Sequence, residues 1–194
     1  MDLPLLNGLV LAGGLSTRMG SDKSLIAYHG KPQREYLFEL LRLVCKDVCV
    51  SCRRDTDVPS SLNPLPDKFE IRSPLNGILS AFEVRSDRAW LTVPVDLPNI
   101  SGEVFKSIVS HRDATKLATC FFDSSAGSIE PLLAIWEPGS QALLAANAAK
   151  GDISPRSFLL THDVKVVYGM DHSIFLNVND PTSRDAYASA NLGK

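Results

Sequence analysis

The feature that most constrains the fold is an apolar run near the start of the chain, from Leu5 to Ala12, which leads directly into the pair Gly13-Gly14. The run is too short for an ordinary helix and lacks polar alternation, so it predicts a strand buried on both faces. Strands covered on both faces are typical of parallel sheets with helices on either side. The first residues therefore indicate an α/β fold.

Strand and helix patterns alternate along the rest of the chain, which favours a three-layer α/β/α, Rossmann-like, mostly parallel sheet. Pro181 and a capping Asp180 predict the start of a last helix, and Ser101 is the expected cap of an earlier one. The predicted strands cover residues 5–12, 47–52, 69–72, 89–96, 115–122, 129–136, 164–168 and 174–179. The predicted helices cover residues 33–46, 76–84, 101–112, 139–150 and 154–160.

Length and charge narrow the class of protein. At 194 residues the chain suits one core, so we expect a single domain over residues 1–194. A net charge of −2 gives no general attraction to nucleic acid or acidic membranes, so any anion site must be local. The sequence has no apolar run of the roughly 18 to 20 residues that span a bilayer, and we expect a cytoplasmic protein without nucleic-acid or membrane partners.

The four cysteines, Cys45, Cys49, Cys52 and Cys120, raise the question of a metal site. Cys49 and Cys52 fall on a predicted strand, where their spacing points the two side chains to opposite faces. We therefore expect buried free thiols in a reducing compartment.

The glycine pair lies where an open α/β sheet binds its ligand, beyond the carboxyl end of a strand. Glycines at this point let main-chain N–H groups approach phosphate oxygens, and Arg18 and Lys23 supply positive charge. Neither the P-loop spacing G-x-x-x-x-G-K-[ST] nor the dinucleotide fingerprint G-x-G-x-x-G is present. The stretch predicts a polyphosphate site of another kind.

Residues 11–23 read L-A-G-G-L-S-T-R-M-G-S-D-K. They resemble the signature L-x-G-G-x-x-x-R-M-G-x-x-K of nucleotidyltransferases that act on nucleoside triphosphates. The fuller form L-A-G-G-x-S-x-R-M-G-x-D-K is similar to that of the molybdenum cofactor guanylyltransferases, a MobA-like branch. The resemblance implies a fold of the nucleotide-diphospho-sugar transferase type.

Five later segments are similar to motifs of the same family and occur in the same order. The family's G-P-L-x-G is matched with Ser73 in place of its first glycine, and Ser51 stands where the family often has asparagine. The segments are "SPLNGILSAF" at 73–82, "VPVDLPNI" at 93–100, "IEPLLAIW" at 129–136, "GDISPRSFL" at 151–159 and "FLNVNDP" at 175–181.

The resemblance implies transfer of GMP from GTP to the phosphate of the molybdenum-molybdopterin cofactor, with release of pyrophosphate. Because the nucleophile is already anionic, no side chain has to remove a proton, and the four histidines have no acidic partner in any motif. Catalysis then depends on positioning and charge neutralisation. GTP and the pterin cofactor are the implied substrates, and molybdoenzymes or their chaperones are further candidate partners.

Asp96 is the first candidate catalytic residue. It ends an apolar strand at the crevice, where a carboxylate is costly unless it is hydrated, paired or bound to a cation. Mg²⁺ needs only one or two carboxylates when phosphate oxygens and water complete its shell, so Asp96 is the predicted metal ligand and Mg²⁺ the predicted cofactor. The alternative is a helix cap, for which Ser101 is better placed.

Lys23 and Arg18 are the candidates that face the triphosphate and the leaving pyrophosphate, and a solvated loop is the alternative. The resemblance implies that the main chain of Leu11, Ala12, Gly13 and Gly14 holds the base and ribose.

Five more residues complete the candidate site. Asp67 matches the family aspartate that recognises guanine or ribose, unless it is a plain loop acid. Asn76 and Gly77 are expected to open a helix at the nucleotide, or else only to form a turn. Asn177 and Asn179 on the last predicted strand are expected to reach the metal or the acceptor, with ordinary Asx turns as the alternative.

Other functions share parts of this pattern. A cytidylyltransferase for the same pterin, or a sugar-phosphate or phospholactate nucleotidyltransferase, would use the same triphosphate loop. A nucleotide-binding regulator without turnover is disfavoured, because a binder needs no metal-holding Asp96 together with Lys23. A dehydrogenase is disfavoured by the missing glycine fingerprint.

Overall fold

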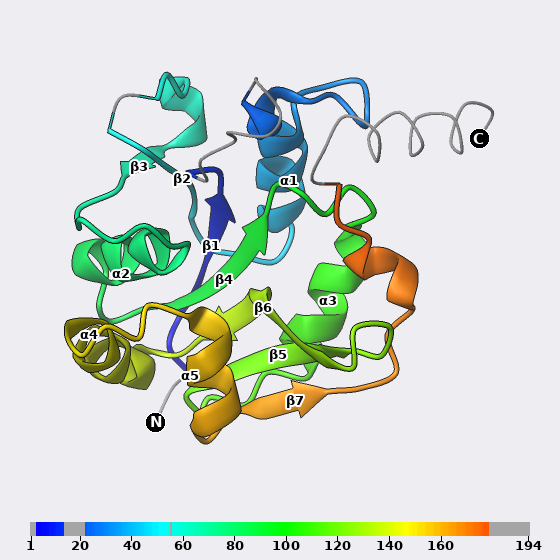
Figure 1. Cartoon of the computed structure of the whole chain (residues 1–194). Helices are drawn as coiled ribbons and strands as arrows, with labels where there is room; N and C mark the ends of the chain where they lie inside the picture. The colour runs from blue at the N-terminus through cyan, green and yellow to red at the C-terminus, as the bar shows by residue number, and fades with distance from the viewer. Residues whose placement is uncertain (1–2, 14–21, 55, 179–194) are drawn as a thin grey trace.

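The computed structural model describes residues 3–13, 22–54 and 56–178. Its centre is a seven-stranded sheet in the order β3-β2-β1-β4-β6-β5-β7 (Figure 1). Strand β6 runs antiparallel to β4 and β5, and the other paired strands are parallel. The strands are β1 (Leu6–Leu11), β2 (Val48–Cys52), β3 (Pro64–Pro66), β4 (Ala89–Pro94), β5 (Ala118–Asp123), β6 (Ser128–Trp136) and β7 (Lys165–Val167).

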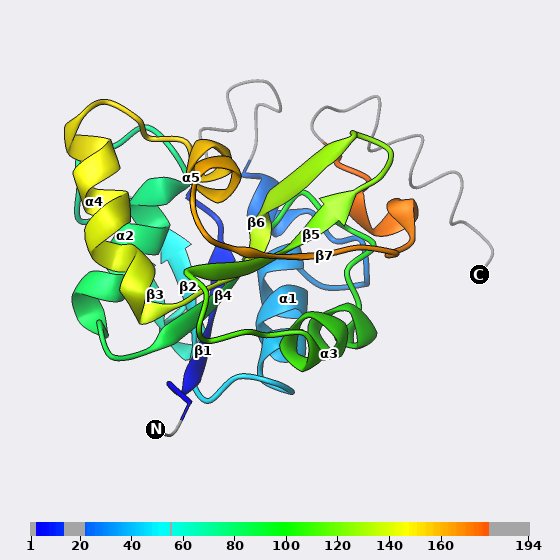
Figure 2. The same cartoon turned by 90° about the horizontal axis from the view of Figure 1, so that it is seen from below.

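Helices cover both faces of the sheet, as the alternating pattern predicts (Figure 2). The core beneath α1 and α3 includes Phe38 and Phe105, and the core beneath α2, α4 and α5 includes Phe82 and Phe158. The helices are α1 (Gln33–Leu41), α2 (Leu75–Val84), α3 (Gly102–Ser110), α4 (Gln141–Ala149) and α5 (Pro155–Thr161). The three-layer, mostly parallel α/β prediction is confirmed.

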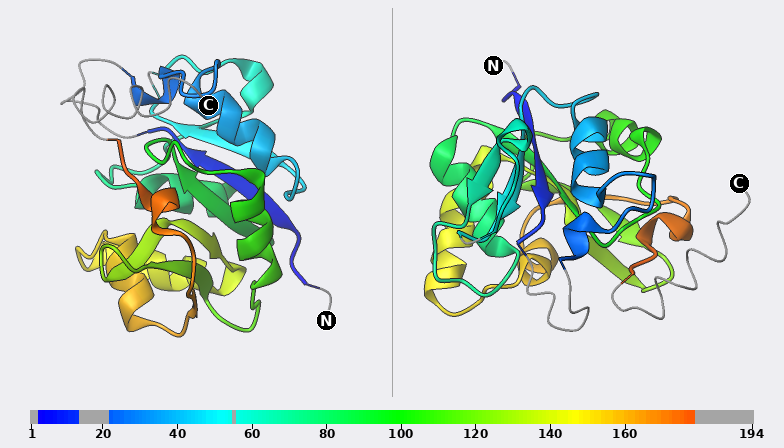
Figure 3. Two further views of the ribbon diagram at one scale, coloured as in Figure 1. Left: turned by 90° about the vertical axis from the view of Figure 1, so that its right-hand side faces the viewer. Right: turned by 90° about the horizontal axis from the view of Figure 1, so that it is seen from above.

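Strands β1 and β4 form the centre of the sheet. They pair in parallel from Leu6 opposite Ala89 to Leu11 opposite Pro94, and every residue of both strands is buried. Because the register is unbroken, the two chains leave the sheet at the same edge. That edge is seen from above in the right-hand view of Figure 3, with α2 on one side of β1 and α1 on the other.

Two strand predictions are wrong. Residues 69–72 do not pair with the sheet, and the strand of this region is β3, which lies at an edge where prolines are tolerated. Residues 174–178 form no strand either: the 3₁₀ helix η4 (His172–Phe175) is followed by an extended segment that meets the β4 side through one backbone hydrogen bond, from Val178 N to Asp96 O (2.9 Å).

Smaller differences occur at element ends. β4 ends at Pro94, so Asp96 lies in the turn beyond the strand and not at its last position. Ser101 occupies the N-cap position of α3, but its side chain makes no capping hydrogen bond. The helix predicted after Asp180 and Pro181 lies outside the described residues.

Strand β6 contains an irregularity that affects the crevice. Its pairing with β5 jumps from Ala134 opposite Cys120 to Glu130 opposite Phe121, so residues 131–133 bulge out of the ladder. Bulges of this kind re-aim side chains and are common beside active sites.

No helix in the described parts of the chain is both long and apolar enough to cross a membrane.

The packing of α2 against the strand ends depends on Gly77. A Cβ at this position would overlap the Ser51 hydroxyl and lie 3.1 Å from Leu11 Cδ2. We expect Gly77→Ala to lower the free energy of unfolding by about 1–3 kcal/mol, because overpacking outweighs the gain in helix propensity. Urea unfolding measures this.

Gly102→Ala is the matched control, since a Cβ there meets nothing closer than Leu43 Cδ1 at 3.5 Å. We expect its stability to be equal to or above that of the wild type. Equal stability of the two alanine variants would contradict this packing argument.

Candidate functional site

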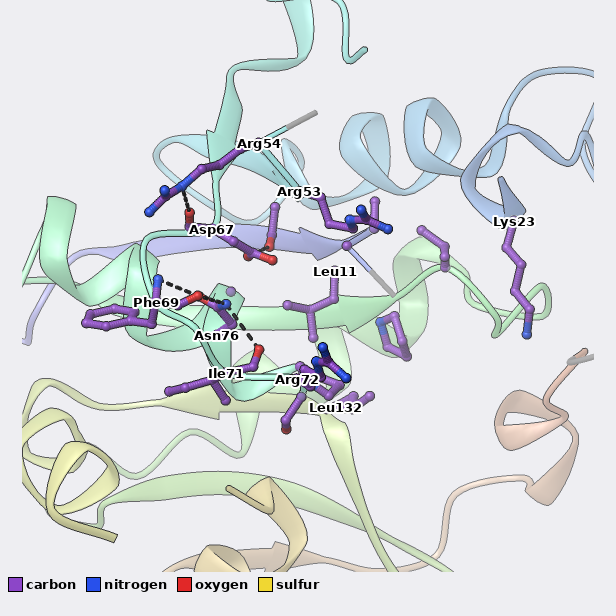
Figure 4. Close-up of a pocket in the computed structure, with 18 of the residues that line it drawn as sticks. Leu11, Lys23, Arg53, Arg54, Asp67, Phe69, Ile71, Arg72, Asn76 and Leu132 are labelled. Carbon is purple, nitrogen blue, oxygen red and sulfur yellow. Dashed lines mark hydrogen bonds between the residues drawn. The ribbon is translucent and has the colours of Figure 1, made fainter. Parts of the chain in front are cut away.

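A pocket with a volume of about 750 Å³ opens at the carboxyl ends of the central strands. This is within the range of small-molecule sites, and the position is where open α/β sheets bind ligands. Figure 4 shows its walls, which come from segments far apart in the sequence. The lining includes the ends of β1, β2 and β4, the 3₁₀ helix η1 (Lys23–Leu25), the loop between β3 and α2, and Leu132 of the β6 bulge.

Asp96 and Lys23 both line this pocket. Burial raises the pKa of Asp96, while a hydrogen bond from the Asn177 side chain and the nearby Lys23 ammonium lower it in part. Asp96 Oδ1 is buried and accepts no hydrogen bond within the described structure. A carboxylate oxygen in this state is costly unless a cation or another donor meets it.

Asp67 lies on the opposite side of the β1 end, beside Gly13. A Cβ on Gly13 would stand 3.4 Å from Asp67 Oδ2, and Ser51 Oγ donates to Asp67 Oδ1 at 3.5 Å. Burial raises the pKa of Asp67, and the Ser51 hydroxyl with the guanidinium groups of Arg53 and Arg54 offsets part of the rise. This half-buried acceptor next to a bare backbone suits a hydroxyl or amide donor of a ligand.

Asn76 lines the pocket, but its side chain is committed to the protein. Its amide nitrogen donates to the carbonyl oxygens of Phe69 and Ile71, and its Oδ1 accepts from Phe69 N at 3.2 Å (dashed in Figure 4). The side chain is 5% exposed. Asn76 therefore holds the loop before α2 in place, and any contribution to a ligand comes through that loop.

Among the described residues, four cationic side chains line the pocket: Lys23, Arg53, Arg54 and Arg72. Arg54 donates from Nε to Asp67 O (3.0 Å) and from Nη2 to Lys68 O (3.2 Å), so it too fixes the loop. Arg53 lies near the Asp67 carboxylate.

The structure brings most of the predicted site residues together. Asn177 does not line the pocket but reaches the Asp96 carboxylate, and it does so from an extended segment, not from a strand. Gly14, Arg18 and Asn179 lie outside the described residues. The predicted residues that line the pocket are Leu11, Ala12, Gly13, Lys23, Asp67, Asn76, Gly77 and Asp96.

Sequence reasoning missed several residues at this site. Arg54 belongs to an irregular stretch of the sequence and Arg72 ends the strand wrongly predicted at 69–72, so only tertiary contacts place them at the pocket. Glu130 accepts from Leu132 N at 2.9 Å, while Thr92 Oγ1 donates to Leu132 O at 2.8 Å, and together they fix the bulge that brings Leu132 to the pocket. The sequence signal for this bulge was Glu130, a charged residue directly before a proline in an otherwise apolar strand.

The donor set fits one kind of metal. Among the described residues, no three His, Cys, Asp or Glu side chains form a cluster that could hold an ion. A protein cage for zinc or calcium is therefore not formed by these residues. A single carboxylate with an uncommitted buried oxygen suits Mg²⁺ that arrives with phosphate oxygens and water.

None of the four histidines lines the pocket. His29 hydrogen-bonds to Pro98 O (2.8 Å) and stacks on Tyr36, and His162 stacks on Phe158. All four cysteines have free thiols, and burial raises the pKa of Cys45 and of Cys120 to about 12. The pocket thus offers carboxylates and cations, which suits charge neutralisation of a polyphosphate.

Comparison with known proteins agrees with this chemistry. The chain is 31% identical over 179 residues to a "Molybdenum cofactor biosynthesis bifunctional protein" of Synechocystis. The alignment covers 91% of this chain and 52% of that protein. The chain thus spans about half the length of that relative. It is 28% identical over 190 residues to a "Molybdenum cofactor guanylyltransferase" of Burkholderia vietnamiensis, covering 91% of this chain and 92% of the relative.

A solved structure shares the fold. The molybdopterin-guanine dinucleotide biosynthesis protein A of Archaeoglobus fulgidus superimposes with a TM-score of 0.78 at 18% identity, over 97% of this chain and 100% of that one. The family model described as "MobA-like NTP transferase domain" matches residues 8–166. The segments that form the pocket walls lie within this match, and the chain belongs to the MobA-like NTP transferase family, a family of nucleotidyltransferases.

Proposed function

We propose that this chain transfers GMP from GTP to the phosphate of a molybdopterin acceptor and releases pyrophosphate. The observation that carries the proposal is the meeting of Asp96 and Lys23 in one pocket with the glycine end of β1. The names of the relatives support the choice of GTP and of the pterin acceptor. The proposed unit is one domain over residues 1–194, and the free thiols suit the reducing cytoplasm as its location.

Mg²⁺ is the proposed cofactor, and Asp96 is the residue that would hold it, with Asn177 orienting the carboxylate. When bound, the ion would neutralise charge on the phosphate oxygens. Asn177 hydrogen-bonds to the carboxylate and so restricts its orientation, while Oδ1 stays buried and has no hydrogen-bond partner among the described residues.

Lys23 is proposed to bind the triphosphate and to stabilise the charge that develops on pyrophosphate as it leaves. Its helix η1 is capped by Asp22, whose carboxylate accepts from Ser24 N at 2.9 Å, so the start of the helix is fixed. Arg18 is proposed to assist it. Loss of one such donor costs roughly 2.7 to 4 kcal/mol of transition-state stabilisation in related cases.

The nucleoside is proposed to lie between the main chain of Leu11 to Gly14 and the Asp67 carboxylate. Gly13 keeps the backbone beside Asp67 bare, Gly77 lets α2 pack closely against Ser51 and Leu11, and Asn76 fixes the loop beside them. Asp67 is proposed to accept a hydrogen bond from the ribose or the guanine. Asn179 is proposed to act on the acceptor side with Asn177.

The first test is turnover. Purified protein with Mg²⁺ should release pyrophosphate from GTP only when the molybdopterin acceptor is added, and Asp96→Asn should reduce kcat/KM by roughly 100- to 1,000-fold with the fold intact. A coupled pyrophosphate assay measures both. Asp113→Asn, outside the pocket lining, is the control that should keep full activity.

Equal turnover of CTP, or turnover with a sugar phosphate in place of the pterin, would replace the guanylyl assignment with another nucleotidyltransferase. If GTP stabilised the protein but no acceptor supported turnover, the result would favour a nucleotide-binding regulator.

The second test is the stability of the metal-free protein. Because burial raises the pKa of Asp96, the folded chain favours the protonated carboxyl, and ionisation lowers the free energy of unfolding as pH rises above about 4. Without metal and nucleotide, Asp96→Asn should therefore be more stable than the wild type at pH 7, with the difference vanishing in acid. Urea unfolding in EDTA measures this.

The control variant, Asp113→Asn, should change the stability in the opposite direction. Hydrogen bonds from Thr115 lower the pKa of Asp113, so its charged form stabilises the fold at neutral pH and Asp113→Asn should lose stability there. Adding Mg²⁺ and GTP should raise the stability of the wild type and leave Asp96→Asn unchanged. An Asp96→Asn variant less stable than the wild type at every pH would contradict this view of the site.

A further inference from the structure

Arg72 is a cationic side chain of the pocket wall that has no role in the proposed reaction. It lines the pocket from the loop between β3 and α2, and it is exposed. Lys23 and Arg53 have partners, and Arg54 is bonded to the loop carbonyls. In the part of the chain that the structure describes, the Arg72 side chain makes no hydrogen bond or ion pair, so its donors are available to a ligand.

The backbone on both sides of Arg72 is anchored. Asn76 Nδ2 donates to Ile71 O at 3.2 Å, and Ser73 Oγ donates to Ile153 O at 2.6 Å while accepting from Leu75 N. The serine that replaces the family glycine therefore ties this loop to the segment before α5. A guanidinium on a fixed backbone loses less entropy on binding than one on a mobile loop.

Arg72 and Lys23 stand on different walls of the pocket. Lys23 comes from η1 in the connection after β1, whereas Arg72 lies beside Leu132 of the β6 bulge, and the two cations are well separated across the pocket (Figure 4). Lys23 is the cation whose charge lowers the pKa of Asp96, so the two groups lie near each other. The leaving pyrophosphate is therefore assigned to the Lys23 side of the α-phosphorus.

In phosphoryl-type transfer the attacking and leaving oxygens lie roughly in line, so the nucleophile approaches from the side opposite the leaving group. The nucleophile proposed here is itself a phosphate, which is repelled by the α-phosphate it attacks. Arginine matches a phosphate with two parallel N–H donors and keeps its charge at any physiological pH.

We infer that Arg72 binds the attacking phosphate of the acceptor and orients it toward the α-phosphorus of the nucleotide. This inference rests on the proposed function and adds a residue that recognises the acceptor. An oxygen of the acceptor phosphate forms the new P–O bond as the bond to pyrophosphate breaks, and Arg72 exchanges no proton in this step.

Steady-state kinetics with each substrate varied separately tests the inference. Arg72→Ala should raise KM for the acceptor about tenfold or more, the scale of a lost charged hydrogen bond, and leave KM for GTP within about twofold. Arg72→Lys should recover part of the loss, because it restores the charge without the paired donors. Stabilisation by Mg²⁺ and GTP in a thermal-shift assay should be unchanged, which also shows that the variant pocket is folded.

Arg42→Ala, an exposed arginine at the end of α1, is the matched control and should leave both KM values unchanged. An unchanged acceptor KM in Arg72→Ala, or an equal rise in KM for GTP, overturns the inference while wild-type turnover leaves the proposed function standing. A wild-type protein that releases no pyrophosphate with the acceptor overturns the proposed function, and this inference with it.

Discussion

The site depends on the parallel pairing of β1 with β4. These two buried strands run in unbroken register, so the chain after Leu11 and the chain after Pro94 leave the sheet side by side. One exit carries the glycines and Lys23, and the other carries Asp96. The proposed reaction requires a cation and a metal-holding carboxylate at the same triphosphate, and this register directs the two segments that carry Lys23 and Asp96 to the same edge of the sheet.

Around β1 and β4, the pocket is completed by loops that polar side chains hold in place. Asn76 and Arg54 bond the carbonyl groups of the loop before α2, and Thr92 with Glu130 fixes the bulge that presents Leu132. The same arrangement leaves Asp96 Oδ1 buried without a donor among the described residues. The protein thus carries a local cost in stability at the position proposed to hold the cation, as functional sites often do.

The sequence was sufficient for the central strands, the helices and the Asp96–Lys23 pair, because buried strands and fixed motif spacing are local signals. It misplaced the edge strand, since Pro64 and Pro66 read as strand breakers although an edge tolerates them. It also predicted a strand at residues 174–178, where Ile174, Phe175 and Val178 are buried although the segment forms no ladder of hydrogen bonds. The positions of Arg54 and Arg72 depend on the path of an irregular loop, which no periodic pattern encodes.

A crystal structure with Mg²⁺ and a non-hydrolysable GTP analogue tests the central claim most directly. We expect Mg²⁺ to be bound by an Asp96 carboxylate oxygen together with phosphate oxygens of the nucleotide, and the Lys23 ammonium to contact the phosphates. Metal and triphosphate bound away from Asp96, or a nucleotide whose phosphates point away from Lys23, would contradict it.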